Sequence, residues 1–418
     1  MPHNKGRVLL ICYYFPPLGG AGIGRTMSLF KELGDFGYDC HVLTVKPVVY
    51  RMYEDELLKE LDSSRIFRSD SIDPQRLLYL LGFRKISSKH ADNSRAVSRS
   101  FFPDSKVGWV KPAMRRGQKL INKNSYDLIL SSSPPVSAHL VARELSEKNK
   151  IPWIADWRDY WTSFKPEDLY QNKSHVDKCK KLIAALNSTA RIATSVNSSF
   201  ARYVGAKKII HNSFDKDDAR LWSDENRSDK FVIGLFGTLS DLTPVRPLFE
   251  LLTELKEQSV DVFEKVSLLQ IGQVDSDWLD RQIKEYGLAG KIEKRGYLPR
   301  QQAIKELNSA ALLYLGLSEE HGLGITTGRI YTLLASGRPL LAFAGKDSEL
   351  AGLLKEVAGS FVFDTENISS ALQFVKQLIE KHDSENSKIS PIPEHARNFS
   401  STNMVRQFAK LFDEVLGK

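Results

Sequence analysis

Short, strongly apolar runs alternate with helical stretches along almost the whole chain, and they do so in two successive series. The first series begins with the run 7–14 and ends with 208–210, and the second extends from 231 to about 382. A strand that is apolar on both faces is typical of a parallel sheet, whose strands are joined by crossover helices. The pattern therefore predicts an α/β chain with two Rossmann-like parallel-sheet domains that face each other across a cleft.

A polar segment, residues 215–230, separates the two series. It contains Asp-Lys-Asp-Asp and Ser-Asp-Glu-Asn, and we interpret it as an interdomain linker. The N-terminal domain is then expected in residues 1–214 and the C-terminal domain in residues 231–395. The last stretch, 396–418, places apolar residues on one face at helical spacing and predicts an amphipathic helix.

The composition is that of a globular protein, with 42% hydrophobic and 26% charged residues among 418. No window of ~18 consecutive apolar residues occurs and no charged-then-apolar leader begins the chain, so we expect neither a transmembrane helix nor a signal peptide. Three widely spaced cysteines favour a reducing cytoplasm, and nine scattered histidines form no metal-binding pattern. A cytoplasmic protein that needs no metal ion is expected.

Positive charge is concentrated in one part of the chain. The net charge is 59 − 51 = +8, and residues 1–120 alone hold 20 Lys/Arg against 12 Asp/Glu, so they contain the whole excess. Such a one-sided basic region indicates an anionic partner: a nucleotide, a membrane surface or a nucleic acid. No nucleic-acid-binding module is recognisable, which makes nucleic acid the weakest of the three.

A glycine-rich loop follows the first predicted strand. Gly20, Ala21 and Gly22 lie between this strand and a helix, where small residues allow a close backbone approach and the helix N-terminus favours an anion. Arg25 follows on the first helical turn. The spacing matches neither a dinucleotide-binding fingerprint nor a P-loop, so a tight turn without a ligand is the alternative.

Charged and aromatic residues gather at the end of another predicted strand, 153–157. Asp156 or Asp159 could orient or polarise a substrate hydroxyl there, and Arg158 lies between them. The alternative is an internal ion pair between Arg158 and an aspartate. His139 follows a Ser-Ser-Ser-Pro-Pro stretch in a similar position, with a packing role as its alternative.

Two loops in the second series have the character of phosphate-binding segments. Gly237 and Thr238 end a strand, and Arg246 lies in the following helix. A Gly/Thr-rich loop then runs into a short helix that begins near Arg329, whose guanidinium would add positive charge to a site built from backbone amides.

Taken in order, these motifs resemble the retaining glycosyltransferases of family 4, in the branch that builds bacterial capsular and extracellular polysaccharides. The similarity covers nearly the whole chain. It rests on these stretches: Tyr13 to Arg25, Pro103-Asp104 with Gly108-Trp109, Ser133-Pro134-Pro135 with His139, Asp156 to Trp161, Asn212 to Asp215, Gly237-Thr238, and Arg329 to Pro339.

The resemblance implies a GT-B fold and transfer of a sugar from a nucleoside-diphosphate donor to a hydroxyl acceptor, with retention and without a metal or other cofactor. The acceptor is expected to be a lipid-linked or polysaccharide intermediate. The last helix would cross back to the first domain. Arg246 and Arg329 would act on the donor diphosphate, and Asp156 and Asp159 are the other catalytic candidates. The remaining donor-side candidates are Gly20, Ala21, Gly22, Gly237, Thr238, Tyr297, Leu298, Glu320 and Thr332, and the acceptor-side candidates are Arg25, His139 and Arg158.

One feature departs from the family pattern. The second of two glutamates usual at the nucleotide site is replaced by Thr332, and Glu320 offers a substitute carboxylate. We predict that Thr332 faces the nucleotide ribose. Two alternatives to glycosyl transfer stay open: a nucleotide-sugar epimerase of the same fold, such as a UDP-N-acetylglucosamine 2-epimerase, and a catalytically silent binding protein.

Residues 76–85 read Arg-Leu-Leu-Tyr-Leu-Leu-Gly-Phe-Arg-Lys, an apolar run between cationic ends. It is too short to span a bilayer, but it could lie among lipid headgroups. The sequence therefore predicts that residues 76–119 bind an anionic membrane surface at the inner face of the membrane. The alternative is a helix whose apolar face belongs to the core.

Overall fold

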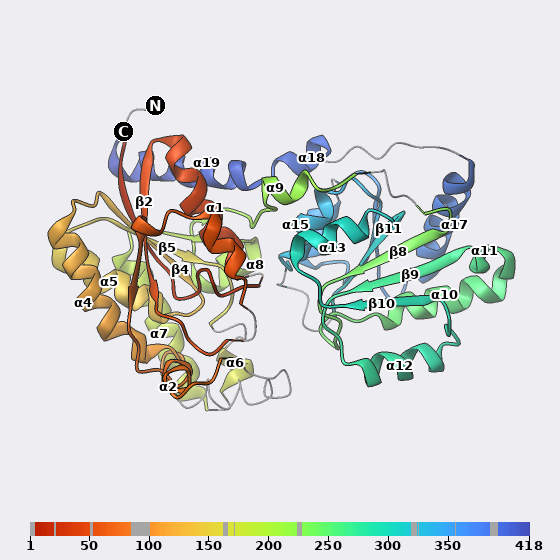
Figure 1. The fold of residues 1–418 in the computed structure, drawn as a ribbon, viewed down its shortest axis with the longest axis horizontal. Coiled ribbons are helices and arrows are strands. Elements are labelled where there is room, and N and C mark those ends of the chain that lie inside the picture. The colour runs from red at the N-terminus through yellow and green to blue at the C-terminus, as the bar shows by residue number, and fades with distance from the viewer. Residues whose placement is uncertain are drawn as a thin grey trace. The chain divides into compact units, whose positions relative to one another are not determined.

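The computed structural model describes residues 5–20, 22–50, 53–84, 101–161, 166–170, 172–223, 228–318, 324, 326–355, 357–384 and 392–418. The chain forms two compact units, each built around its own sheet (Figure 1). The first unit contains Met1–Asn212 together with Ser401–Lys418, and the second contains Ser213–Ser400.

The first unit has a seven-stranded sheet in the order β3-β2-β1-β4-β5-β6-β7. Every neighbouring pair is parallel, which confirms the predicted fold class. The strands are β1 (Gly6–Ile11), β2 (Tyr38–Val45), β3 (Ile66–Ser69), β4 (Leu128–Ser133), β5 (Trp153–Trp157), β6 (Ile192–Ser195) and β7 (Lys208–Ile209).

Helices cover both faces of this sheet. One apolar layer packs under α4 (Val107–Lys123), α5 (Ser137–Asn149) and α7 (Lys173–Thr189). The other packs under α1 (Gly24–Glu32) and α19 (Ser401–Leu416). The remaining helices of this unit are the 3-10 turns η1 (Leu33–Phe36), η2 (Asp55–Glu60) and η3 (Ser63–Arg65), with α2 (Pro74–Leu80), α6 (Pro166–Leu169) and α8 (Ser198–Val204).

The second unit repeats this plan with a six-stranded sheet in the order β10-β9-β8-β11-β12-β13, again parallel throughout. The strands are β8 (Phe231–Phe236), β9 (Val266–Ile271), β10 (Ile292–Gly296), β11 (Leu312–Gly316), β12 (Leu340–Phe343) and β13 (Ser360–Phe363). The helices are α9 (Lys216–Ala219), α10 (Arg246–Gln258), α11 (Val260–Glu264), α12 (Ser276–Glu285), α13 (Arg300–Leu307), α15 (Arg329–Leu334), α16 (Glu349–Leu354), α17 (Ile368–Ser384) and α18 (Glu394–Arg397).

The segment 215–223, expected as part of a linker, is instead folded into the second unit. Asp215 caps α9 by accepting a hydrogen bond from the amide of Asp217 (2.8 Å). Ala219 and Trp222 are buried in the core of the second unit, and the Arg338 guanidinium lies 5.1 Å from the Trp222 ring. The many polar residues of this run made the two buried ones hard to recognise in the sequence. The boundary between the two units lies at 212/213 rather than after residue 214.

The last helix, α19, belongs to the first unit although it is contiguous in sequence with the second. Met404, Val405, Phe408 and Phe412 are buried against the first sheet. The Asp413 carboxylate accepts hydrogen bonds from Lys5 Nζ (2.9 Å) and from the Tyr38 hydroxyl (2.8 Å), so this end of the chain is tied to its beginning.

A buried ion pair lies between this helical layer and the sheet. Arg25, on α1, donates from Nε and Nη2 to the two carboxylate oxygens of Asp156 on β5, at 2.9 and 2.8 Å. The hydroxyls of Ser132 on β4 (2.9 Å) and Thr194 on β6 (2.8 Å) donate to the same carboxylate. Burial by itself raises the pKa of Asp156, but the Arg25 charge and these hydrogen bonds hold it below its usual value.

Arg25 makes two further contacts from the same position. Its Nη1 donates to the His211 carbonyl (2.9 Å), and its guanidinium lies 4.8 Å from the Phe408 ring of α19. The pair therefore joins strands β4, β5 and β6 to α1, α19 and the chain segment at residue 211.

Removing one partner of a buried ion pair leaves the other charge desolvated and unpaired. We therefore expect Arg25→Met to lower the free energy of unfolding by about 3–5 kcal/mol. Urea unfolding followed by tryptophan fluorescence is the measurement, since Trp109, Trp153, Trp157 and Trp161 lie in the first unit. Arg7→Met, which breaks the partly exposed Arg7–Asp39 pair, is the control and should cost at most ~1 kcal/mol. Equal losses in the two variants would contradict the importance of the buried pair.

Candidate active site

In open parallel sheets, ligands bind beyond the carboxyl ends of the strands. In the second unit, this edge carries the loop 237–245 after β8 and the loop that ends at α15. Both loops were singled out in the sequence, and the structure brings them together through Arg329. The candidate site is built from this contact.

Arg329 holds the start of the β8 loop through its guanidinium. Nη1 donates to the carbonyl oxygens of Phe236 (2.9 Å) and Thr238 (3.1 Å), and Nε donates to the Thr327 hydroxyl (3.3 Å). The side chain passes directly over Gly237, where a Cβ atom would lie 2.3 Å from Arg329 Cδ. Gly237 also has φ +98°, so two independent constraints require glycine at this position.

The charge of Arg329 is not neutralised by any carboxylate within ion-pair distance in the described ranges. Burial alone lowers the pKa of its guanidinium to about 10, so the group stays protonated at neutral pH. Its Nη2 donates no hydrogen bond to the part of the chain that the structure describes. A cation that burial has partly desolvated, and that has an unused donor group, is suited to bind an anion. The anion replaces the electrostatic stabilisation that the cation lost with its hydration.

Arg246 lies at the other end of the same loop, as the first residue of α10. Its side chain is 63% exposed and pairs with Glu250 at 3.0 Å, a hydrogen bond that raises the pKa of Arg246. Thr238, near the start of this loop, has an exposed side chain and accepts a hydrogen bond at its carbonyl from Thr243 (2.6 Å). That Arg246 and Arg329 converge on one diphosphate stays a prediction.

The surroundings of Thr332 contain two residues that the sequence reasoning missed. The Thr332 hydroxyl accepts a hydrogen bond from Arg300 Nη2 (3.2 Å), and Arg300 Nε pairs with Asp218 (2.6 Å). Arg300 begins α13 two residues after Leu298, and its hydrogen bond to Thr332 connects the Tyr297-Leu298 turn with Thr332. Tyr297 is exposed, whereas Leu298 packs against the core. Only the position of Arg300 after a Gly-Tyr-Leu-Pro turn could have marked it, and Asp218 lies in the supposed linker.

In the first unit, the glycine loop and Arg158 meet at the same edge of the sheet. The Gly22 carbonyl accepts a hydrogen bond from Arg158 Nη1, and Arg158 Nε donates to the Ser133 carbonyl (3.0 Å). Gly20 has φ +92° and donates its amide to the Glu54 carboxylate (3.1 Å). Ala21 and Glu320, two of the predicted contacts, lie outside the described residues.

Three of the predicted acceptor-side and catalytic residues are buried: Arg25, His139 and Asp156. Asp156 pairs with Arg25 and not with Arg158, and neither it nor His139 exposes any surface. Neither side chain is accessible to solvent. A substrate could contact Asp156 or His139 directly only if the residues packed around them moved. Asp159 is half-buried and accepts a hydrogen bond from the Tyr160 amide (2.8 Å).

His139 is held as a neutral ring. Trp153 Nε1 donates to Ser131 Oγ (2.7 Å), and Ser131 Oγ lies 2.7 Å from His139 Nδ1. Ser131 Oγ therefore links the Trp153 indole to the His139 ring. Burial lowers the pKa of His139 to about 3, and the ring lies 4.3 Å from that of Trp157. These contacts agree with the alternative that His139 has a packing role.

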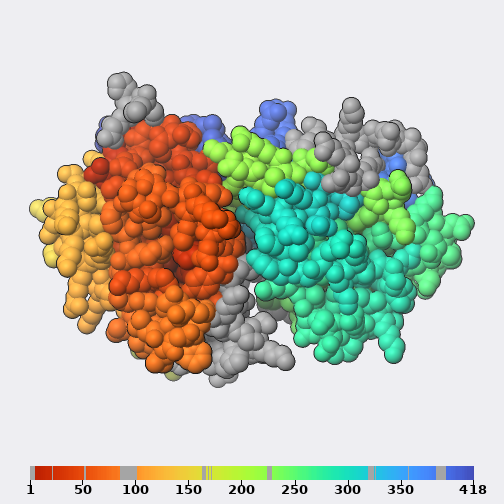
Figure 2. Space-filling view, viewed as in Figure 1, coloured from red at the N-terminus to blue at the C-terminus, as the bar shows by residue number. Residues whose placement is uncertain are grey.

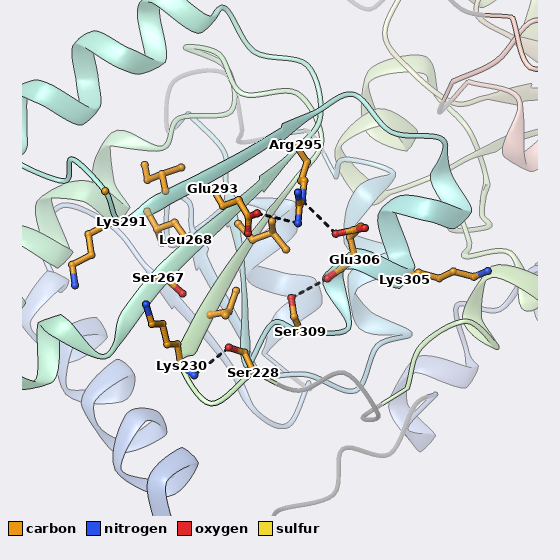
Figure 3. Close-up of a pocket in the computed structure, with 14 residues that line it drawn as sticks. Ser228, Lys230, Ser267, Leu268, Lys291, Glu293, Arg295, Lys305, Glu306 and Ser309 are labelled. Carbon is orange, nitrogen blue, oxygen red and sulfur yellow. Dashed lines mark hydrogen bonds and ion pairs between the residues drawn. The ribbon is translucent and has the colours of Figure 1, made fainter.

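An open hollow of about 710 Å³ lies elsewhere in the second unit (Figure 3). Its walls include Lys230 and Ser267, which precede or begin their strands, so it occupies the amino ends of β8 and β9 and the edge strand β10. Arg295 within it is already paired with Glu293 (2.9 Å) and Glu306 (3.4 Å). Both the position and the internal charge pairing distinguish this hollow from the Arg329 site.

No family model matches the sequence, and no curated protein sequence matches it. Solved structures do. A sucrose-phosphate synthase from Thermosynechococcus elongatus shares 11% identity at a TM-score of 0.65, with 99% of this chain and 100% of that chain covered. The Anabaena protein HepE, solved in complex with UDP-glucose, shares 15% identity at a TM-score of 0.59, with 98% and 100% covered.

A putative UDP-N-acetylglucosamine 2-epimerase from Listeria monocytogenes is also similar, with 10% identity, a TM-score of 0.54, and 98% of this chain and 96% of that chain covered. At these identities, the likeness concerns the fold. The two parallel α/β units, their seven- and six-stranded sheets and the similarity over whole chains establish that this protein has the GT-B fold.

Proposed function

We propose that this protein transfers a glycosyl unit from a nucleoside-diphosphate sugar to a hydroxyl acceptor. The observation that supports this most directly is the half-buried Arg329 guanidinium, which has no carboxylate partner among the described residues and lies at the carboxyl edge of the second sheet. In a GT-B chain this is a site for the diphosphate of a donor. The likeness to HepE, solved with UDP-glucose, agrees with a nucleotide sugar.

The proposed chemistry uses charge and position. As the bond between sugar and diphosphate breaks, negative charge grows on the leaving phosphate oxygens, and the Arg329 guanidinium offsets it from a preorganised position. Arg246, at the other end of the loop, adds a second cation. Transfer is proposed to occur with retention, as in glycosyltransferase family 4, with the leaving diphosphate accepting the acceptor proton and without a metal ion.

The acceptor is proposed to bind the first unit. Arg158, one of the acceptor-side candidates, lies at the carboxyl edge of its sheet, and Asp159 follows it directly in sequence. A lipid-linked or polysaccharide intermediate at the cytoplasmic membrane face is the proposed acceptor class. No helix in the described ranges is long and apolar enough to cross a membrane, and peripheral association is proposed instead.

Two alternatives make different predictions for one assay. A nucleotide-sugar epimerase, favoured by the likeness to the Listeria protein, turns over the donor without any acceptor. A silent binding protein, favoured by Thr332 in place of a glutamate, binds the donor but neither transfers nor hydrolyses the sugar. Donor turnover measured with and without saccharide acceptors separates the three.

Arg329→Ala should lower turnover of the nucleotide sugar by ~10²-fold or more, the scale of losing one preorganised donor to a developing charge. Arg329→Lys should fall between, because an ammonium keeps the charge but loses the planar fork. Arg281→Ala, which removes an exposed cation of the same unit, is the control. Unchanged turnover in a folded Arg329→Ala protein would refute the assignment.

Gly237→Ala provides a test that leaves Arg329 in place. The added methyl would collide with Arg329 Cδ at 2.3 Å, so the guanidinium should be displaced and donor affinity should fall by about tenfold or more. Gly290→Ala is the matched control: its φ of +78° carries similar backbone strain, but a Cβ there meets no atom within 4 Å. If the two variants bind a nucleoside diphosphate equally well in calorimetry, Gly237 has no role in holding Arg329.

Thr332→Val tests the predicted ribose contact with almost no change in shape. Losing one hydroxyl hydrogen bond should weaken nucleoside-diphosphate binding by about 2–10-fold. Thr253→Val is the control, because Thr253 on α10 bonds only its own helix, through the Phe249 carbonyl (3.0 Å). A nucleotide-bound structure that places the ribose away from Thr332 would contradict the prediction even if the affinity changed.

A further inference from the structure

Helix α2 (Pro74–Leu80) buries a charged residue and exposes its apolar residues, the reverse of a typical surface helix. Arg76 is its buried residue, whereas its leucines face outward. Leu80 is 62% exposed and Leu81, just after the helix, is 75% exposed. The alternative that this run is a core helix of the first unit is therefore wrong: the apolar face is on the outside.

The exposed apolar residues form a group that we call the apolar ridge. Its members are Ile72, Leu77, Leu78, Leu80, Leu81 and Phe83. A second exposed pair, Phe101 and Phe102, immediately precedes the segment whose Lys106 donates to Gln75 and whose Gly108 carbonyl accepts from the Ile72 amide. Together they make up eight of the thirteen large apolar side chains that are exposed in the described ranges. Such concentration marks an interaction surface.

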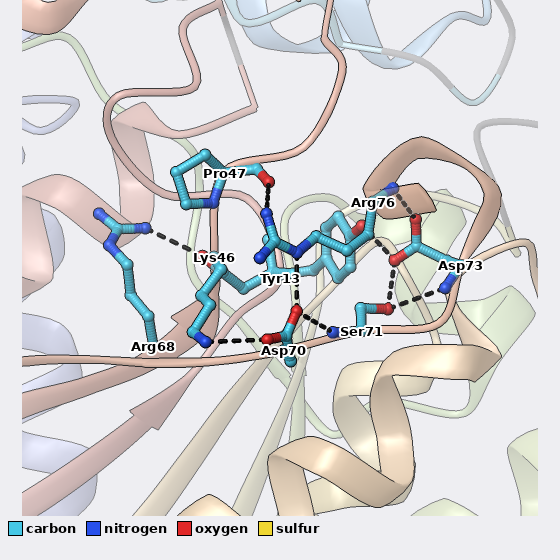
Figure 4. Close-up of polar contacts among 9 residues, drawn as sticks. Tyr13, Lys46, Pro47, Arg68, Asp70, Ser71, Asp73 and Arg76 are labelled. Carbon is cyan, nitrogen blue, oxygen red and sulfur yellow. Dashed lines mark hydrogen bonds and ion pairs between the residues drawn. The ribbon is translucent and has the colours of Figure 1, made fainter. Parts of the chain in front are cut away.

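A buried polar network holds the ridge in this orientation (Figure 4). The Asp73 carboxylate accepts from the Tyr13 hydroxyl (2.6 Å) and from the Arg76 amide (3.0 Å). Arg76 donates in turn to Asp70 (2.7 Å) and to the Pro47 carbonyl (2.8 Å). Tyr13, Asp73 and Arg76 are buried, so turning the leucines inward would bring Arg76 out and break its hydrogen bonds to Asp70 and Pro47. The exposure of the leucines is thus imposed by the fold.

A helix rich in Lys and Arg begins beside the ridge. Helix α4 begins against it, since a Cβ at Gly108 would lie 3.0 Å from Ile72 Cγ1. This helix has no acidic residue, and its Lys/Arg side chains make no ion pair in the described part of the chain; they are Lys111, Arg115, Arg116, Lys119 and Lys123. Residues 65–119 hold 13 Lys/Arg against 4 Asp/Glu, a net charge of +9. The partner must therefore be apolar at its centre and anionic around it.

We infer that the apolar ridge inserts into the headgroup region of an anionic lipid bilayer, with the α4 cations facing lipid phosphates. A seven-residue helix is too short to span the bilayer and lies in its interface. A second copy of the chain does not fit, because it would bring two segments of charge +9 together. Figure 2 shows the orange segment that includes α2 as an outer surface of the first unit.

This surface is connected to the proposed acceptor edge. Tyr13, which donates to Asp73, follows β1, and Asp70, which accepts from Arg76, directly follows β3. The network that orients the ridge therefore also holds the carboxyl ends of β1 and β3. Bilayer binding itself does not depend on the donor chemistry, so it is tested without a nucleotide sugar.

The test is sedimentation of the full chain with vesicles of phosphatidylcholine alone and of phosphatidylcholine mixed with phosphatidylglycerol. The chain should bind the mixed vesicles in a salt-sensitive way. The variant Leu80→Ser/Leu81→Ser/Phe83→Ser should lower the partition coefficient by at least about tenfold. Leu242→Ser/Val260→Ser, which alters exposed apolar residues of the second unit, should bind like the unmodified chain.

Charge is tested by a second pair of variants. Lys111→Glu/Arg115→Glu/Lys119→Glu should abolish the preference for anionic vesicles, and Arg281→Glu/Lys284→Glu/Lys305→Glu, with the same change in net charge, should retain it. Equal binding to both vesicle types, or none, overturns the proposal. So does a chain that is dimeric in ultracentrifugation and becomes monomeric on ridge substitution without binding vesicles, since that assigns the ridge to a second copy. The substituted side chains are exposed, and an unchanged thermal midpoint confirms folding.

Discussion

The bidentate pair between Arg25 and Asp156 is the contact on which the first unit depends. It is the meeting point of three neighbouring strands, the first helix and the last helix, and it is fully removed from water. Because Arg25 lies three residues after Gly22, the same pair sets where the glycine loop leaves the sheet. A charge pair can hold such a position only when every lone pair is satisfied, and here two hydroxyls complete the set.

Arg329 shows the opposite electrostatic situation. Its side chain is half-buried and also holds backbone in place, but among the described residues it bonds only neutral oxygen atoms and meets no carboxylate that would offset its charge. The contrast separates a structural arginine from one that is ready for an anion. The same reasoning applies to α2, where the buried Arg76 is paired with Asp70, whereas the leucines are exposed. In both places the group that has no partner among the described residues, a charge at Arg329 and an apolar surface at α2, indicates the kind of ligand that would bind there.

Several functional candidates could be found from sequence, but their roles could not. Gly237 and Arg329 are far apart along the chain, and nothing in the local pattern shows that one lies beneath the other. The aspartate at position 156 was assigned either to a substrate or to Arg158. The structure pairs it with Arg25, because the α1 helix packs over the face of the sheet to which Asp156 points. Asp218 was hidden in a polar run that happened to contain two core residues.

The sequence by itself determined the fold class, because apolar strands followed by helices can bury both strand faces only in a parallel α/β layer arrangement. It also showed that residues 76–85 form an apolar run between cations, but it did not show which face of helix α2 would be buried. Only the tertiary structure decided which charges are neutralised. That depends on contacts such as Arg25 with Asp156 and Arg300 with Asp218, which join residues distant in sequence. Local spacing contains no information about such contacts, because packing of whole helices against the sheets creates them.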